Sequence, residues 1–349
     1  MQAPPAQHYP RAIFAPPHRA KMPSQETKLD VAIRLTDGTR VVIRTRRELG
    51  FQRVDQSTTP SFTIDQELLA GALKRLAPLF AHEAGAARPV VQAGKFVILP
   101  GDFARQLNVA ESVDRLRTAV EQNPALTQFT VVLTKTPPTL TANRLQGMTG
   151  VLAQMVTHTS PNVKRNRNIQ LASEAIDGTL LAPGEVFSLN ETVGKRTQAR
   201  GYRTATVFVG ARKVNGIGGG VSQVTGTLFN AAALADLTIK EVHPHSRPVS
   251  YLPLGRDATV AYGEKDLKFV NSTAAPVFIA YTLQGTTLTA TLYGAPVLNR
   301  KITLTPAVRH RGPGRINAQL YRTVYENGKL VTKERLFSHA YRWKANGSP

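Results

Sequence analysis

The sequence contains no cysteine among its 349 residues. Disulfide bonds, zinc sites built from cysteine and catalysis by a thiol are therefore excluded. No apolar run approaches the length of about 18 residues that a membrane-spanning helix requires, so no transmembrane segment is predicted. No signal peptide is visible either, because residues 1–30 contain six prolines and no apolar stretch of roughly 7–15 residues. Residues 1–28 are expected to form a disordered, proline-rich tail.

Acidic residues are scarce. Asp and Glu number 23 against 44 Lys and Arg, which gives a net charge of +21 at pH 7. Such a chain attracts polyanions, which include nucleic acid, anionic lipid, and the carboxylates and phosphates of a bacterial wall. Its basic residues are scattered, and no helix-turn-helix, zinc-finger or RNA-binding aromatic motif is visible. We therefore expect no nucleic-acid partner.

The first half of the chain has the pattern of a small α+β domain over residues 29–136. Apolar and polar residues alternate over 29–44 on both sides of Asp37-Gly38, which predicts a β-hairpin. Residues 63–66 resemble a capping box that opens a helix, and Asn108 is placed to cap a second helix.

Two adjacent prolines, Pro137 and Pro138, mark the domain boundary, since they interrupt both helix and sheet. Helical spacing of Leu145, Met148 and Leu152 predicts a helix directly after them. The rest of residues 137–296 is rich in short strands and glycine turns around one central helix. In the extension 297–349, Asn327-Gly328 between two strand-like runs predicts a β-hairpin. The predicted fold class is α+β, with two α+β domains and a C-terminal β-hairpin.

Three successive glycines, Gly218, Gly219 and Gly220, precede a run with helical periodicity that begins at Val221. Glycine is costly in regular structure, so this run indicates a close backbone approach or a sharp turn into a helix. Ser222 and Gln223 then fall in the first helical turn, where free N–H groups and the positive end of the helix dipole favour an anion. The same position could stabilise the developing charge of a reaction.

These glycines belong to a longer series of motifs between Asn168 and Thr273 that resembles the VanW family. The matching runs are Asn168–Asn190, Val193–Thr197, Gly201-Tyr202, Gly218–Ala232, His245–Val260, Tyr262-Gly263, Asp266–Phe269 and Asn271–Thr273. The family takes its name from a gene in some vancomycin-resistance clusters. The resemblance implies a bacterial cell-envelope or extracellular location and peptidoglycan or its precursors as partner, but no particular reaction. Residues 29–136 resemble the peptidoglycan-binding domain often found ahead of VanW domains, and the C-terminal hairpin resembles segments that close many members.

The chain departs from the family at Ser222, where most members carry cysteine. Three interpretations of Ser222 stay open: it caps the helix, it contacts a ligand, or it is a nucleophile. As a nucleophile it would need a neighbouring base. His245 is the candidate base, and Asp257 or Asp266 could orient it.

Further candidates for a ligand site combine glycine, amide, acidic, basic and aromatic side chains. Glu185 can equally support a turn, Asp257 and Asp266 can satisfy turn N–H groups, and basic runs are usually solvated faces. His243 and His245 have no third ligand nearby, so neither a metal nor a cofactor is expected. The ligand-binding candidates are Gly218, Gly219, Gly220, Gln223, Glu185, Asn190, Arg196, Arg203, Tyr251 and Asp266.

The sequence thus predicts an accessory envelope protein that binds peptidoglycan or its precursors. The alternative is a peptidoglycan hydrolase or transpeptidase that uses Ser222 and His245, with Asp257 as their partner. The binding protein and the enzyme differ in whether Ser222 acts as a catalytic nucleophile. The oligomeric state stays open.

Overall fold

The computed structural model describes residues 29–54, 61–209 and 212–343, so the tail predicted over residues 1–28 lies outside the described residues. The chain divides into two compact units. The first comprises the residues up to 85 together with 102–138, and the second comprises 86–101 together with the residues from 139 onward. Each unit has its own apolar core. The fold class is α+β, as predicted.

The first unit combines two helices that contact each other with three small sheets. The hairpin predicted around Asp37-Gly38 is confirmed as two antiparallel strands, and a third strand pairs parallel to the first of them. The elements are β1 (Ala32–Thr36), β2 (Val41–Thr45), β3 (Phe51–Val54), β4 (Ser61–Ile64), α1 (Gln66–Phe80), β7 (Ala104–Leu107), α2 (Val109–Gln122), β8 (Gln128–Thr130) and β9 (Leu133–Thr136).

The two helix starts of this unit differ in how well the sequence predicted them. Asn108 caps α2 and accepts a hydrogen bond from the Glu111 N–H, as expected. In α1 the cap is Asp65, which accepts from the N–H groups of Glu67 and Leu68. The capping box predicted over residues 63–66 therefore begins two residues too early, because Thr63 still belongs to β4.

The second unit is built on a four-stranded antiparallel sheet in the order β10-β18-β17-β11. Two helices cover it: α3 contacts β17, α5 contacts β10 and β18, and the helices contact each other. The helix predicted over Leu145, Met148 and Leu152 is wrong. A short 3-10 helix, η2 (Ala142–Leu145), is followed by a strand, because residues from Gly150 pair with a strand more than a hundred residues later. These elements are β10 (Gly150–His158), α3 (Val163–Ile176), β11 (Thr179–Leu181), α5 (Val221–Leu234), β17 (Val277–Gln284) and β18 (Thr287–Gly294).

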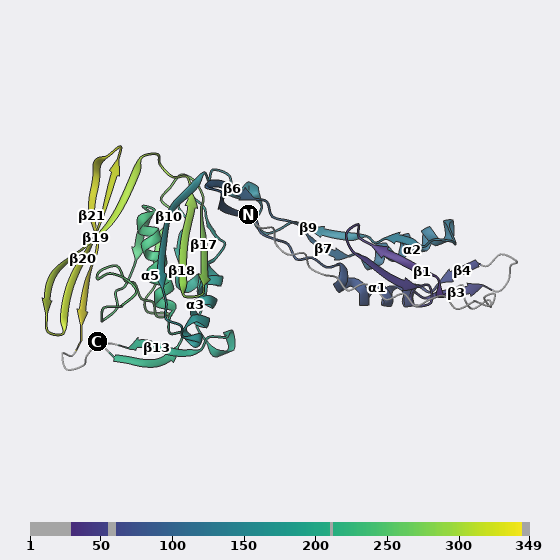
Figure 1. The fold of residues 1–349 in the computed structure, drawn as a ribbon, viewed down its shortest axis with the longest axis horizontal. Helices are drawn as coiled ribbons and strands as arrows, with labels where there is room; N and C mark the ends of the chain where they lie inside the picture. The colour runs from purple at the N-terminus through teal and green to yellow at the C-terminus, as the bar shows by residue number, and fades with distance from the viewer. Residues whose placement is uncertain (1–28, 55–60, 210–211, 344–349) are drawn as a thin grey trace, which may run out of the picture. The chain divides into compact units, whose positions relative to one another are not determined.

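Helix α5 lies at the centre of this unit, between two sheets (Figure 1). All its residues except Ser222 and Leu234 are buried. The four polar ones among them, Gln223, Thr225, Thr227 and Asn230, form hydrogen bonds inside the core. On its other side is a sheet of three long strands, β19 (Arg300–Gly312), β20 (Arg315–Glu326) and β21 (Lys329–Arg342), from which Phe337 contacts Phe229 of α5. The hairpin predicted at Asn327-Gly328 is confirmed, with both residues at positive φ. Strand β19 extends it to a sheet that the sequence did not predict.

Shorter elements complete the second unit. The β5–β6 hairpin joins it through a two-bond ion pair between Arg88 and Asp177 at 2.8 Å. Among the described helices, none combines the length and apolar character needed to cross a bilayer. The shorter elements are β5 (Arg88–Gln92), β6 (Lys95–Leu99), β12 (Val186–Ser188), α4 (Leu189–Val193), η3 (Gln198–Arg200), β13 (Thr204–Val209), β14 (Arg212–Ile217), β15 (Thr238–Glu241) and β16 (Lys268–Val270).

Candidate functional site

The three glycines form a tight turn between β14 and α5. Gly218 and Gly220 have positive φ, at 85° and 112°. Gly219 has no room for a side chain, since a Cβ there would lie 2.5 Å from the Thr206 carbonyl oxygen of β13. Asn168 of α3, which is fully buried, holds the turn by donating to the carbonyl oxygens of Gly219 and Arg203. The backbone of the glycine turn is therefore held between β13 and Asn168 of α3 just before α5 begins.

Ser222 does not cap α5. The cap position is Gly220, which has no side chain to cap with, and Ser222 lies one residue inside the helix. Its Oγ shares a hydrogen bond of 3.0 Å with the Thr259 hydroxyl. Among the described residues, no hydrogen bond joins Ser222 to His245. The side chain is half-buried and reaches the cavity described next.

A cavity of about 370 Å³, here called the small chamber, opens at the start of α5. The glycine turn, the first turn of α5, the β13–β14 hairpin and the loop after β15 enclose it. None of its lining residues is acidic. They are Arg165, Lys195, Arg196, Thr206, Val207, Phe208, Ile217–Gln223, His245, Tyr251 and Thr259–Tyr262.

Two arginines bring positive charge into the small chamber without a carboxylate partner. Arg165 donates to the Gln223 side-chain oxygen at 2.9 Å, and Arg196 donates to the Asn190 side-chain oxygen at 2.7 Å. The Arg196 Nη2 is buried and, within the described chain, has no hydrogen-bond partner. Burial lowers the pKa of both guanidinium groups, which means that their charge is costly where it stands. An anionic ligand would offset that cost.

Behind the chamber, a buried carboxylate orients His245. Asp257, which is 1% exposed, accepts hydrogen bonds from the His245 backbone N–H and from Nδ1 of its ring, both at 2.9 Å. Its other oxygen accepts from the Tyr341 hydroxyl and lies 3.3 Å from Nδ1 of His339. Burial alone would raise the pKa of Asp257, but the contacts with the two histidines outweigh burial and lower it. Asp257 is thus held as a carboxylate that fixes the imidazole.

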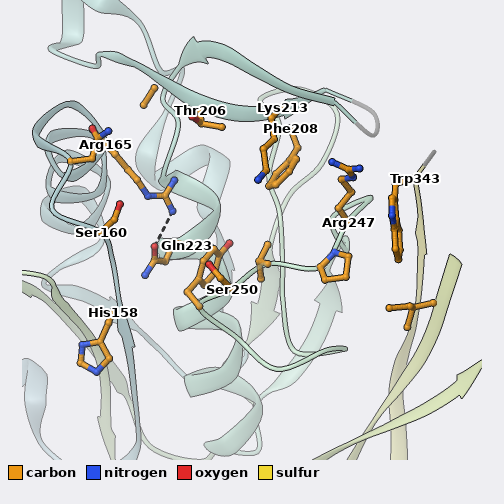
Figure 2. Close-up of a pocket in the computed structure, with 16 residues that line it drawn as sticks. His158, Ser160, Arg165, Thr206, Phe208, Lys213, Gln223, Arg247, Ser250 and Trp343 are labelled. Carbon is orange, nitrogen blue, oxygen red and sulfur yellow. Dashed lines mark hydrogen bonds between the residues drawn. The ribbon is translucent and has the colours of Figure 1, made fainter. Parts of the chain in front are cut away.

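A second cavity of about 670 Å³, the large chamber, adjoins the small one. The two share Arg165, Thr206, Phe208, Gln223 and Tyr251. Figure 2 shows Arg165 bonded to Gln223 at one side, Phe208 and Lys213 pointing in from the β13–β14 hairpin, and Arg247 and Trp343 at the opposite side. The large chamber also has no acidic residue in its lining.

The structure brings most of the predicted site residues together. Gly218, Gly219, Gly220, Ser222, Gln223, Arg196, His245 and Tyr251 line the small chamber. Three more stand behind it: Asn190 holds Arg196, Asp257 holds His245, and Asp266 bonds to Ser188 and to the Asn190 backbone.

The other two predicted residues also line neither chamber. Glu185 is exposed and accepts from the Ala182 N–H, so it supports a turn. Arg203 is exposed, and only its backbone groups contact Asn168. His243 bonds to Glu241, so the two histidines of the His243-Pro244-His245 run have different partners.

Several lining residues were not singled out from the sequence. Arg165 was not among the predicted site residues; Asn162 caps α3 and thereby places Arg165 in the first turn of that helix. Phe208 and Thr206 lie two residues apart on β13 and therefore on the same face of the strand, a pattern that by itself indicates no ligand. Trp343 follows β21 at the far end of the chain, and no sequence signal connected it with α5.

Comparisons with known proteins match the same region. Residues 164–293 match a family described as VanW like protein. The uncharacterized protein YoaR of Bacillus subtilis is 41% identical over 169 residues, which cover 48% of this chain and 56% of that protein. The vancomycin B-type resistance protein VanW of Enterococcus faecalis is 31% identical over 121 residues, which cover 33% of this chain and 44% of that protein. The chain spans about half the length of these curated relatives. No solved structure matches.

Proposed function

The chain is a VanW family protein through its residues 164–293, and from this premise we propose that it is a cell-envelope protein that binds peptidoglycan or its precursors. The small chamber at the start of α5 is the binding site in this proposal. The carrying observation is that Arg165 and Arg196 are partly buried there while no acidic residue lines the cavity.

Wall peptides and wall precursors carry the negative charge that the lining of the small chamber lacks. A carboxylate or phosphate in the chamber could accept hydrogen bonds from both guanidinium groups and face the first turn of α5. The Arg196 Nη2, which has no partner among the described residues, is one donor that such a group would satisfy. The net charge of +21 adds a long-range attraction to an anionic wall.

We expect Arg165→Gln to weaken binding to purified murein sacculi about 10- to 100-fold. The substitution keeps a polar group beside Gln223 but removes a charged donor, and hydrogen bonds to charged groups contribute about 1.5–3 kcal/mol. Binding is measured by co-sedimentation with sacculi at several salt concentrations, because attraction by surface charge weakens with salt and a partly buried contact is less screened.

Arg203→Gln is the matched control, since it removes the same charge from an exposed side chain outside both chambers. It should leave sacculus binding within about twofold of the parent protein, a change of under 0.5 kcal/mol. Equal losses in the two variants would mean that net charge, and not the chamber, carries binding. No binding of the parent protein at low salt would overturn the proposed function itself.

The His245–Asp257 pair keeps the second candidate function, a wall hydrolase or transpeptidase, open to test. An imidazole oriented by a buried carboxylate is the usual partner of a nucleophilic side chain, and Ser222 lines the same chamber. However, the Ser222 hydroxyl is bonded to Thr259. We therefore regard Ser222 as part of the binding surface.

Ser222→Ala should change sacculus binding by less than about 13-fold, because it removes one neutral hydrogen bond of about 0.5–1.5 kcal/mol at most. Chromatography of the soluble fragments should show no release from sacculi by either protein. The informative contrast is Ser222→Cys, which restores the residue that most family members carry. Fragment release by the parent protein that Ser222→Ala and His245→Ala both abolish would establish the enzyme instead.

A further inference from the structure

We propose that the large chamber is a sugar subsite that takes an N-acetylated amino sugar of a glycan, with Trp343 as one of its walls. This inference rests on the proposed function and divides the ligand between the two chambers. The small chamber takes the anionic group, and the large chamber takes the sugar ring that carries it. The C-terminal sheet thereby contributes to the binding site.

The aromatic lining is the first observation behind the sugar subsite. Phe208, Tyr251 and Trp343 line the large chamber from three different segments. Flat aromatic rings offer an apolar face at low conformational cost, with a polar edge on tyrosine and tryptophan. The faces of a sugar ring carry C–H groups while its edges carry hydroxyls, so such walls suit it. An extended acidic polymer without rings would have no use for them.

Trp343 is held in place although it follows the last strand. Its backbone N–H donates to the Gly314 carbonyl oxygen at 2.8 Å. Its ring packs against a small core cluster that contains Ile316 and Tyr341. Figure 2 places Trp343 across the chamber from Arg165, with Arg247 between Trp343 and Phe208. A side chain fixed in this way loses little conformational entropy when it contacts a ligand.

The polar lining is the second observation. Between the aromatic rings, Ser160, Thr206 and Ser250 line the large chamber with hydroxyl groups and Asn162 with an amide, while the Gln223 amide there is already bonded to Arg165 and Thr157. Hydroxyl and amide groups both donate and accept hydrogen bonds. Sugar hydroxyls and an acetamido group need both kinds of partner, whereas a purely anionic ligand needs donors alone. The cavity volume of about 670 Å³ lies within the range of small-molecule sites.

The connection between the two chambers determines how the groups of the ligand are arranged. The Arg165–Gln223 pair lines both cavities, so a group bound against it in the small chamber adjoins the large one. An amino sugar that bears a carboxylate through a short linkage has this arrangement of groups. The geometry therefore fits a glycan unit with its attached acidic substituent better than a free peptide.

Trp343 is the only tryptophan of the chain, so its fluorescence reports on the large chamber directly. The probe is the neutral tetramer of N-acetylglucosamine, which has no anionic group for the small chamber. We expect a saturable change in emission at low-millimolar concentrations, with the same affinity at low and high salt. A neutral probe also separates sugar binding from general attraction to the basic surface.

Phe208→Ala should weaken binding of the tetramer about tenfold, measured by calorimetry as well as fluorescence. Phe103→Ala is the matched control, since this exposed phenylalanine belongs to the first unit and lines neither chamber. Trp343→Ala, followed by calorimetry, is the second variant and should also lose about tenfold. Circular dichroism verifies that each variant is folded.

The outcomes separate this inference from the proposed function. Sacculus binding without any response to the tetramer would overturn the sugar subsite and leave the function intact. A response to the tetramer without sacculus binding would overturn the function and leave the subsite intact. Tetramer binding that neither Phe208→Ala nor Trp343→Ala weakens would place sugar binding elsewhere and overturn the inference.

Discussion

Replacing Gly219 by alanine is expected to destabilise the second unit by about 1–3 kcal/mol and to abolish ligand binding. A Cβ at this position would lie 2.5 Å from the Thr206 oxygen and 2.7 Å from the Ala205 carbonyl carbon. Both are backbone atoms of β13, so neither can move aside as a flexible side chain could. Forcing an extra methyl group into a packed site typically costs that much. Because the same turn places Arg196 and the start of α5, the small chamber should deform with it.

The emission of Trp343 during thermal unfolding measures this loss, because the tryptophan belongs to the second unit. Gly312→Ala is the control within that unit. Its nearest neighbour would be the tip of the His310 side chain at 3.1 Å, which can rotate away. Gly312→Ala should unfold within about 0.5 kcal/mol of the parent protein. Gly219→Ala that unfolds and binds like the parent would show that the turn needs no glycine here.

The sequence could predict the glycine turn and its helix because the signals there are local. Gly218, Gly219 and Gly220 are adjacent, and the apolar residues from Val221 onward recur at the short spacing of a helix. The same holds for the cap of α2 at Asn108 and for the turn at Asn327-Gly328. Each is decided by a few neighbouring residues whose conformational preferences agree with the fold.

The walls of the site could not be predicted in this way, because strand pairing and sheet packing bring them from distant parts of the chain. Trp343 and two of the partners of Asp257, His339 and Tyr341, come from the β21 segment, whereas Arg165 comes from α3. The error over residues 145–152 has a related cause. A short apolar run fits a helix or a strand equally well, and the pairing of β10 with β18 decides it. Sequence reasoning therefore named the residues around the start of α5 that line the small chamber and missed the lining residues that come from distant segments.

Glu185 and Arg203 illustrate the opposite error. Both lie within or beside motifs that resemble the VanW family, and both were among the ligand-binding candidates. In the structure Glu185 accepts a bond within its own turn, and the backbone of Arg203 anchors Asn168. A motif residue can thus stabilise the backbone of a turn without lining either chamber.

Asp257→Asn should destabilise the second unit by about 3–5 kcal/mol at neutral pH and remove part of its acid sensitivity. The carboxylate is buried against His245, His339 and Tyr341, and disrupting one partner of a buried charged network costs about that much. The pKa of Asp257 is lowered in the folded chain. Its contribution is therefore complete above about pH 5 and is lost as the pH falls through the unfolded value of about 3.9 toward the lower folded value.

The measurement is the free energy of unfolding of parent and variant between neutral pH and acid, followed by Trp343 emission. The two curves should converge as the pH falls, because protonation removes from the parent what the substitution removed from the variant. Glu174→Gln makes the same chemical change on an exposed residue of α3 and should follow the parent curve within about 0.5 kcal/mol. Parallel curves for Asp257→Asn would assign the acid sensitivity to other groups. Convergence would instead show that the Asp257 carboxylate stabilises the contact between β21 and the His245 imidazole at the small chamber. Acid would then destabilise the C-terminal sheet and the small chamber together.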